Sequence, residues 1–279
     1  MHNSPKFLAL SLAVAVGCST APTEITVIDE PVRAYDAPSI GRVLLVAANP
    51  AVSEQTGWPI GVWAAELTHP YQEFTAAGYQ VDIASPEGGA IEFDSYSDPR
   101  DPSGYSAGDL ISMGFIMTPK LMERTRSTLR LGDVDPSRYD AVLVCGGQSP
   151  MYTFRGNQSL MDFFAGFHAT GKPTAAICHG TAILLDTKNA SGELLVRGKT
   201  WTGFSNAEED FADAAVGQKI QPFRIEDEAR LIDDTSFQVS APFAAYAVRD
   251  GNLITGQQQN SGAAAARLIV EALAERDGQ

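Results

Sequence analysis

A doubly wound α/β fold, with a mostly parallel sheet covered by helices on both faces, is predicted by two features of the sequence. Short, almost continuously apolar runs recur along the chain, and stretches with helical periodicity separate them. Strands that are apolar along their whole length are buried on both faces, which happens where crossover helices cover a parallel sheet. With 279 residues, 44% of them hydrophobic and 19% charged, the chain is long enough for one large domain of this class.

Five apolar runs are expected to form strands because they are short and rich in residues that favour extended structure. They are VLLVAA (43–48), YQVDIAS (79–85), AVLVC (141–145), PTAAIC (173–178) and the less apolar KTWTGF (199–204). Helical periodicity covers residues 62–77, 119–131, 158–170, 206–215 and 261–275. Residues 86–118 are rich in Gly, Pro, Ser and Asp and are too long for a plain connection, which predicts a functional lid or insertion.

The first 17 residues predict an export signal. Lys6 precedes the apolar run FLALSLAVAVG (7–17), which is too short to span a bilayer but long enough for the apolar core of a signal peptide. The small residues before Cys18 resemble a bacterial lipobox, although Ala15 stands where leucine is usual. We therefore expect Cys18 to be lipidated, with simple cleavage nearby as the alternative.

The same N-terminal pattern predicts location and domain boundaries. Residues 18–40 contain three prolines and no sustained period, which is typical of a tether or N-terminal arm, so the folded domain is expected over residues 41–279. The protein is expected to be exported to the bacterial cell envelope, in the periplasm, and to contact the membrane only through the N-terminal lipid anchor.

The charge balance and the absence of certain motifs exclude several classes of function. A net charge of −14 argues against nucleic acid as a partner, because a phosphate-binding protein needs a basic surface. The sequence contains no Walker loop, no GxGxxG motif, no zinc-ligand spacing and no serine nucleophile elbow. We therefore predict neither a cofactor nor a metal ion.

Cys178 is the first candidate for chemistry. In the run AAICHGT (175–181) it ends an apolar strand and precedes a helical stretch. Such a turn presents its apex side chain at the carboxyl edge of the sheet, where α/β proteins bind ligands. The N-terminus of the following helix is expected to lower the pKa of the thiol and favour the thiolate. The alternative is that Cys178 is a small buried core residue.

A base and an acid are expected beside this thiol. His179 is adjacent to Cys178, but it can act as the base only if the turn brings its ring back toward the sulfur. A catalytic histidine normally needs an acid to orient it. Ser205 and Glu208 match a capping box, which gives Glu208 a structural role and leaves Glu209 as the freer acid.

Two further segments contribute candidates. Glu66 lies in the apolar stretch GWPIGVWAAE (57–66); if it is buried beside Cys178, its pKa is raised and it can move protons, and otherwise it is an exposed helical glutamate. Gly146 and Gly147 allow close approach of the backbone and offer N–H donors for an oxyanion. Cys145, just before them, is expected to be a buried strand residue, the alternative being a disulfide with Cys178.

Taken together, these segments resemble the ThiJ/PfpI superfamily, a flavodoxin-like fold related to class I glutamine amidotransferase domains. Within it they resemble the branch of heat-shock chaperones and cofactor-free glyoxalase III enzymes. The matching segments are GVWAAELTHPYQEFTAAGYQVDIASPEGG (61–89), YDAVLVCGG (139–147), GKPTAAICHG (171–180), KTWTGFSNAEE (199–209) and LITGQQQNSG (253–262). The resemblance implies that Cys178 is the nucleophile, that His179 and Glu209 complete a Cys-His-acid set, and that Glu66 is the carboxylate beside the thiol.

One motif departs from this branch. Where many of its members have Gly-Gly-His-Gly, this chain has Gly146-Gly147-Gln148-Ser149. The backbone donors at Gly147 and Gln148 are expected to survive the change, whereas the side-chain contact of the missing histidine is lost. We expect this difference to affect the choice of substrate and the level of activity.

The resemblance leads to one main functional hypothesis and two alternatives. The main hypothesis is a cofactor-free enzyme that converts a small carbonyl partner, a 2-oxoaldehyde such as methylglyoxal, into a 2-hydroxy acid such as lactate, with deglycase-type activity as an extension. The alternatives are a Cys178-dependent hydrolase or amidase and a stress chaperone of the cell envelope. Because relatives are often dimers, a homodimer is also implied.

Overall fold

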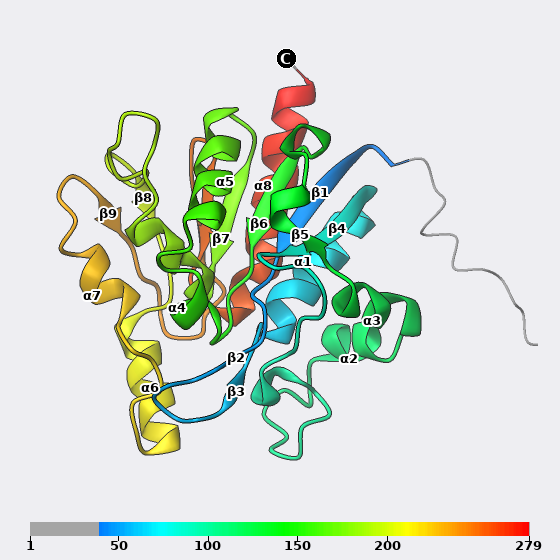
Figure 1. Cartoon of the computed structure of the whole chain (residues 1–279), viewed down its shortest axis with the longest axis vertical. Helices are drawn as coiled ribbons and strands as arrows, with labels where there is room; N and C mark the ends of the chain where they lie inside the picture. The colour runs from blue at the N-terminus through cyan, green and yellow to red at the C-terminus, as the bar shows by residue number, and fades with distance from the viewer. Residues whose placement is uncertain (1–38, 279) are drawn as a thin grey trace, which may run out of the picture. The chain divides into compact units, whose positions relative to one another are not determined.

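Seven strands form a central sheet in the computed structural model, which describes residues 39–278 (Figure 1). The strands are β1 (Gly41–Val46), β4 (Tyr79–Ser85), β5 (Leu129–Arg130), β6 (Ala141–Val144), β7 (Thr174–Ile177), β10 (Ala247–Asp250) and β11 (Leu253–Gly256). Their order in the sheet is β10-β11-β7-β6-β1-β4-β5, and every pair is parallel except β10 with β11. The expected α/β class with a mostly parallel sheet is confirmed.

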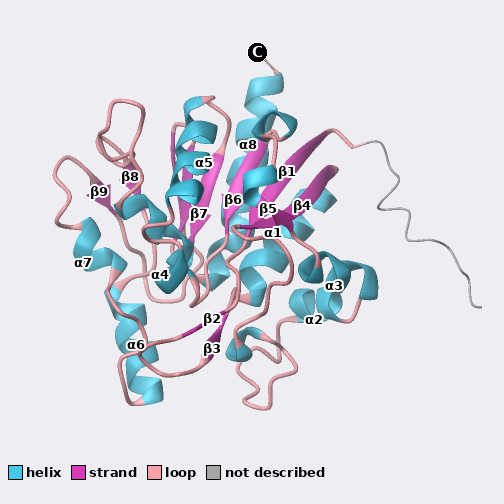
Figure 2. Ribbon diagram, viewed as in Figure 1, coloured by secondary structure: helices cyan, strands magenta, loops and turns pink. Residues whose placement is uncertain are grey.

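Helices cover both faces of this sheet (Figure 2). One face carries α1 (Ala64–Ala76), α2 (Leu110–Ile116), α3 (Pro119–Arg126) and α8 (Gly262–Asp277), and the other carries α4 (Pro150–Thr153), α5 (Gln158–Ala169) and α7 (Ile225–Ala229). Helix α6 (Asn206–Val216) lies beside α7. Within the described part of the chain, none of the helices is both long and apolar enough to cross a bilayer.

Strand β1 contributes side chains to two hydrophobic cores, one on each face of the sheet. Successive side chains of a strand point to opposite faces, so Val43 and Leu45 pack in the core under α1 and α8, while Leu44 and Val46 pack in the core under α5. All four side chains are fully buried. This explains the continuous apolar run in the sequence.

Four of the five expected strands are confirmed as β1, β4, β6 and β7. The expectation of a sheet strand over residues 199–204 is wrong: only β8 (Thr200–Trp201) is extended, and it pairs with β9 (Ser236–Phe237) in a separate two-stranded sheet. The edge of the main sheet is filled instead by β10, which pairs with β11 through a two-residue turn at Gly251 and Asn252. Because that pairing is local in the chain, it closes with little loss of entropy.

Four of the five expected helices also match, as α1, α5, α6 and α8, whereas the helix expected over residues 119–131 is shorter. It ends at Arg126 because Thr128 exchanges backbone hydrogen bonds with Gly89, and β5 then pairs with β4. The 86–118 segment, called the insertion below, connects β4 to α3 and contains a short 3-10 turn (Ser95–Ser97) and α2.

The remaining short elements lie mostly in the connections. They are the hairpin of β2 (Ala51–Val52) and β3 (Pro59–Ile60) and the 3-10 helices Leu131–Asp133, Pro136–Arg138, Cys178–Leu185 and Gln259–Ser261. The predicted signal peptide (1–17), Cys18 and most of the tether (18–40) lie outside the residues that the structure describes.

Candidate active site

Cys178 lies at the turn that follows β7, where the 3-10 helix η5 (Cys178–Leu185) begins. Its φ is +54°, in the left-handed region that L-residues rarely adopt. Strained backbone of this kind persists where the surrounding structure fixes it, often at functional sites. The side chain is 2% exposed and lies at the carboxyl edge of the parallel sheet.

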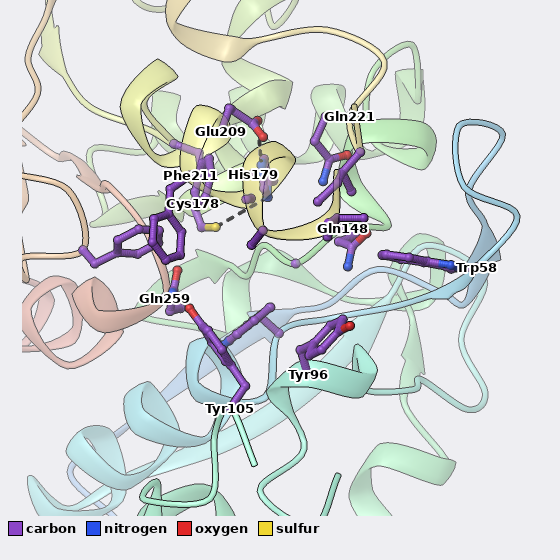
Figure 3. Close-up of a pocket in the computed structure, with 18 residues that line it drawn as sticks. Trp58, Tyr96, Tyr105, Gln148, Cys178, His179, Glu209, Phe211, Gln221 and Gln259 are labelled. Carbon is purple, nitrogen blue, oxygen red and sulfur yellow. Dashed lines mark hydrogen bonds and ion pairs between the residues drawn. The ribbon is translucent and has the colours of Figure 1, made fainter. Parts of the chain in front are cut away.

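The turn brings the ring of His179 back toward the sulfur. Cys178 Sγ lies 3.6 Å from His179 Nδ1, and His179 Nε2 lies 3.1 Å from Glu209 Oε1 (Figure 3). The imidazole also packs on the ring of Phe204, with 4.2 Å between the ring centroids. The structure therefore brings together the predicted thiol, imidazole and acid, and it fixes the imidazole from its edge and its face.

The neighbouring acid has the structural role that the capping box predicts. Ser205 Oγ and the Ser205 N–H both donate to Glu208 Oε2, and the Phe243 N–H and Gln257 Nε2 donate to Glu208 Oε1. All of these contacts hold the start of α6. Glu209, the next residue, is thereby turned toward His179.

Glu66 is fully buried in α1 and lies beside the thiol. The Gly146 N–H donates to Glu66 Oε2 at 2.8 Å, and the carboxyl group also interacts with the Cys178 thiol. A Cβ atom on Gly146 would lie 2.6 Å from Glu66 Oε2 and 2.8 Å from Cys178 Cβ, so only glycine fits between them. Burial raises the pKa of Glu66 to about 8, although the hydrogen bonds from Cys178 and Gly146 oppose the shift. Glu66 is therefore mostly protonated at neutral pH.

The thiol of Cys178 is also neutral at rest. Burial raises its pKa well above the usual value, and the Glu66 carboxylate, which forms only as the pH approaches about 8, raises it further, while the N–H groups of His179 and Gly147 oppose the shift. The expectation that the helix N-terminus lowers this pKa is therefore wrong, because desolvation outweighs the backbone dipoles. Cys145 is buried too, and both cysteines are free, so the alternative of a disulfide between them is not realised.

The backbone donors around the sulfur differ in part from the expected pair. Gly147 adopts a φ of +104°, and a Cβ there would lie 2.4 Å from the Trp63 nitrogen, so this position requires glycine. The N–H of Gln148, an expected oxyanion donor, instead donates to Asp94 Oδ2 at 2.8 Å. The expectation that Gln148 is a free donor is therefore wrong. The backbone N–H groups near the sulfur are those of Gly147 and His179.

A cavity of about 200 Å³ opens above the sulfur. Its walls come from several parts of the chain: the hairpin β2–β3 and the residues after it, the 86–118 insertion, the loop after β6, helix α6 and the residues after it, the loop before β10 and the 3-10 helix Gln259–Ser261. Aromatic side chains contribute much of the lining (Figure 3): Trp58, Trp63, Tyr96, Tyr105, Phe204, Phe211 and Phe243. The insertion thus forms part of the site.

The pattern of the DJ-1/PfpI family matches residues 60–272, which include the thiol, the imidazole and both acids. The chain belongs to the DJ-1/PfpI family. The resemblance seen in the sequence is thereby confirmed.

Several relatives of this DJ-1/PfpI chain are similar over most of its length. Glyoxalase 3 of Candida albicans is 25% identical over 221 residues, which cover 77% of this chain and 91% of that protein. The glutathione-independent glyoxalase HSP31 of Saccharomyces cerevisiae is 27% identical over 230 residues, which cover 78% and 91%. Among solved structures, the Rapid Encystment Protein of 24 kDa from Francisella tularensis has a TM-score of 0.74 at 28% identity and covers 84% of this chain and 99% of that one.

Asp94 is a residue of this DJ-1/PfpI site that the sequence did not indicate, as are the rings that line the cavity. It lies in the insertion, is 1% exposed, and accepts the Gly61 N–H with Oδ1 and the Gln148 N–H with Oδ2, both at 2.8 Å. Burial raises its pKa to about 6. Because it connects the insertion to the loop after β6, Asp94 positions the backbone that faces the sulfur.

Replacing Asp94 with asparagine is expected to shift the stability difference in favour of the variant as the pH rises from about 4 to 7.5. The folded protein holds the Asp94 proton up to about pH 6, so the contribution of this carboxyl to stability falls over that range, whereas asparagine does not titrate. The amide NH₂ that faces one buried N–H costs about 1–3 kcal/mol at every pH. Urea unfolding at pH 4 and pH 7.5 measures both effects. Asp98→Asn is the matched control, since Asp98 belongs to the same insertion but forms a surface ion pair with Arg100 and should change stability little. A stability difference between D94N and the unmodified protein that is the same at pH 4 and pH 7.5 would contradict the raised pKa of Asp94.

Proposed function

We propose that this chain is a cofactor-free, cysteine-dependent glyoxalase that converts a 2-oxoaldehyde such as methylglyoxal, together with water, into a 2-hydroxy acid such as lactate. The observation that carries the proposal is the position of the Cys178 sulfur between two proton-transfer groups, Glu66 and His179. The names of the similar glyoxalases from Candida albicans and Saccharomyces cerevisiae support the same reaction.

The first step joins the thiol to the aldehyde carbon. The thiol proton passes to His179 Nδ1, which lies 3.6 Å from Sγ, and the imidazolium that forms is stabilised by Glu209. The sulfur then bonds to C1 while the imidazolium returns this proton to the aldehyde oxygen, which gives a hemithioacetal and neutral His179. The N–H groups of Gly147 and His179 face the sulfur and stabilise the thiolate as it forms.

The second step moves a hydrogen from C1 to C2. A base removes the C1 proton, an enediol forms, and a proton returns to C2, which leaves a thioester of the 2-hydroxy acid. The Glu66 carboxyl, with a pKa of about 8, can exchange this proton in either direction near neutral pH. No electrons leave the substrate, so the step needs no external oxidant.

The third step releases the product. Water adds to the thioester carbonyl, the S–C1 bond breaks, and the leaving sulfur takes up a proton again. His179, oriented by Glu209, is the group placed to deprotonate the water. The sum of the three steps is one 2-oxoaldehyde plus one water to one 2-hydroxy acid.

Stoichiometric formation of lactate from methylglyoxal tests the proposal. Methylglyoxal consumption and lactate are measured together, because simple thiol adducts consume the aldehyde without releasing the acid. We expect one lactate for each methylglyoxal consumed, without added glutathione or metal. Consumption without lactate, or turnover of amide substrates alone, would overturn the proposal and favour the hydrolase.

A further inference from the structure

The cavity above Cys178 is more apolar than a methyl-substituted substrate requires. Rings form several of its walls, with Trp58, Tyr96 and Tyr105 opposite the sulfur in Figure 3. At the mouth, Tyr105 is 53% exposed and Phe211 is 54% exposed, so these rings gain contacts when an apolar ligand covers them. A three-carbon dicarbonyl held on the sulfur would leave most of this lining in contact with water.

The size of the cavity fits one six-membered ring. Its volume is about 200 Å³, and an engineered apolar protein cavity of about 150 Å³ binds a benzene molecule. It lies below the roughly 300–1,000 Å³ of sites for drug-sized ligands. The space therefore suits a single ring attached to the reacting dicarbonyl and excludes large ring systems.

The polar groups around the cavity select for a neutral ligand. Among the described residues that line it, none is lysine or arginine, and the acid Glu209 is present. The Oε1 atoms of Gln148 and Gln221 are buried without a hydrogen-bond partner, and Gln221 is only 8% exposed. An anionic substituent would find no counterion here, whereas a neutral group that donates a hydrogen bond would find two acceptors.

We propose that the preferred substrates of this site are neutral aryl-substituted 2-oxoaldehydes, with phenylglyoxal as the simplest example. This inference rests on the proposed glyoxalase function. The sulfur bonds to the aldehyde carbon, the C1 hydrogen moves to C2 as a proton, and water breaks the S–C1 bond, so phenylglyoxal plus water gives mandelate. The ring occupies the aromatic cavity throughout these steps.

Initial rates with three substrates test the preference: methylglyoxal, phenylglyoxal and 4-carboxyphenylglyoxal, each followed by its hydroxy acid. We expect kcat/KM for phenylglyoxal to exceed that for methylglyoxal by about tenfold or more, since apolar groups in a fitted pocket discriminate on this scale. For 4-carboxyphenylglyoxal, we expect the added carboxylate to remove most of this gain in kcat/KM. Both aryl substrates have the same ring, so their difference reports the charge.

A pair of substitutions on α6 separates the effect of the cavity from the intrinsic reactivity of the substrates. Ala212 lines the cavity, whereas Ala214, two residues away on the same helix, is exposed and does not line it. Ala212→Phe is expected to lower the phenylglyoxal-to-methylglyoxal ratio of kcat/KM by at least tenfold. Ala214→Phe should leave the ratio unchanged. Intrinsic reactivities cancel when the ratios of two proteins are compared.

The outcomes distinguish this inference from the function on which it rests. If methylglyoxal is converted to lactate at least as efficiently as phenylglyoxal is converted to mandelate, the glyoxalase function stands and the aryl preference is overturned. A ratio that A212F leaves unchanged, in a protein that still forms lactate, overturns the assignment of the cavity as the ring site. If the unmodified protein forms neither hydroxy acid, the proposed function itself fails.

Discussion

Replacing Glu66 with glutamine is expected to make the protein almost inactive and at the same time more stable. Glutamine can still accept the Gly146 N–H, but it cannot carry the substrate proton between C1 and C2. General acid–base groups typically contribute about 10²–10⁴-fold to rate. We therefore expect kcat for lactate formation to fall by that factor, while the shape of the site is retained.

The gain in stability follows from the pKa of Glu66. In the unfolded chain the carboxyl loses its proton near pH 4.5, whereas in the folded protein it keeps the proton up to about pH 8. Between these values folding takes up a proton, so the contribution of Glu66 to stability falls as the pH rises. Glutamine carries no such cost. At pH 7 the difference corresponds to about 3 kcal/mol in favour of E66Q.

Denaturant unfolding at pH 5 and pH 8 measures this effect, because the stability difference between E66Q and the unmodified protein should widen with pH. Glu208→Gln is the matched control. Glu208 is also fully buried, but it accepts hydrogen bonds from Ser205, Phe243 and Gln257, so its substitution should destabilise the protein. A difference for E66Q that does not depend on pH would contradict the raised pKa.

The features that the sequence predicted well depend on residues close together in the chain. The apolar run over residues 43–48 is buried on both faces of the sheet because every side chain meets a helix layer. The capping box of Ser205 and Glu208 closes within one helical turn. Such patterns are fixed by local geometry, so they could be recognised before any tertiary contact was known.

The donors around the sulfur could not be predicted because their partners are remote in sequence. The Gln148 N–H is 54 residues from Asp94, and nothing in the local sequence shows that this donor is already bonded. Asp94 itself lies in an insertion without sustained periodicity. A backbone N–H can be assigned to an oxyanion only when all of its possible acceptors have been placed.

The pKa of the thiol was misjudged because two opposing effects had to be weighed. A turn before a helix favours the thiolate, and the N–H groups of His179 and Gly147 do act in that direction. Desolvation of a side chain that is 2% exposed, together with the nearby Glu66 carboxyl, acts more strongly. The extent of burial and the distance to a remote carboxyl are properties of the tertiary structure.

The edge of the sheet was missed for a similar reason. Strands β10 and β11 are four residues each. The residues of β10, which forms the edge, are only half-buried and show little apolar pattern, whereas those of β11 are buried. The KTWTGF run has stronger strand residues, yet Trp201 packs against Phe237, and the Thr202 N–H donates to the side chain of Thr255. The Thr202 N–H thus bonds to the side chain of Thr255, so the run does not continue as a strand of the main sheet, as its composition had suggested.

Replacing Cys178 with alanine should abolish formation of the hydroxy acid, whereas the same change at Cys145 should not. Without the sulfur, neither the hemithioacetal nor the thioester can form, so kcat is expected to fall by about 10³-fold or more. The remaining groups Glu66, His179 and Glu209 cannot replace a covalent intermediate. Mandelate or lactate formation in single-turnover experiments gives the rate directly.

Cys145 makes this comparison specific because the two thiols share much of their environment. Both are buried, and burial, together with the Glu66 carboxylate once it ionises, raises the pKa of each. Only Cys178 lies at the strained turn, faces His179 Nδ1 and borders the cavity. If C178A kept its activity while C145A lost it, Cys145 and not Cys178 would carry the reacting sulfur. If both variants lost activity while remaining folded, the two thiols would act together, which the proposed steps do not allow.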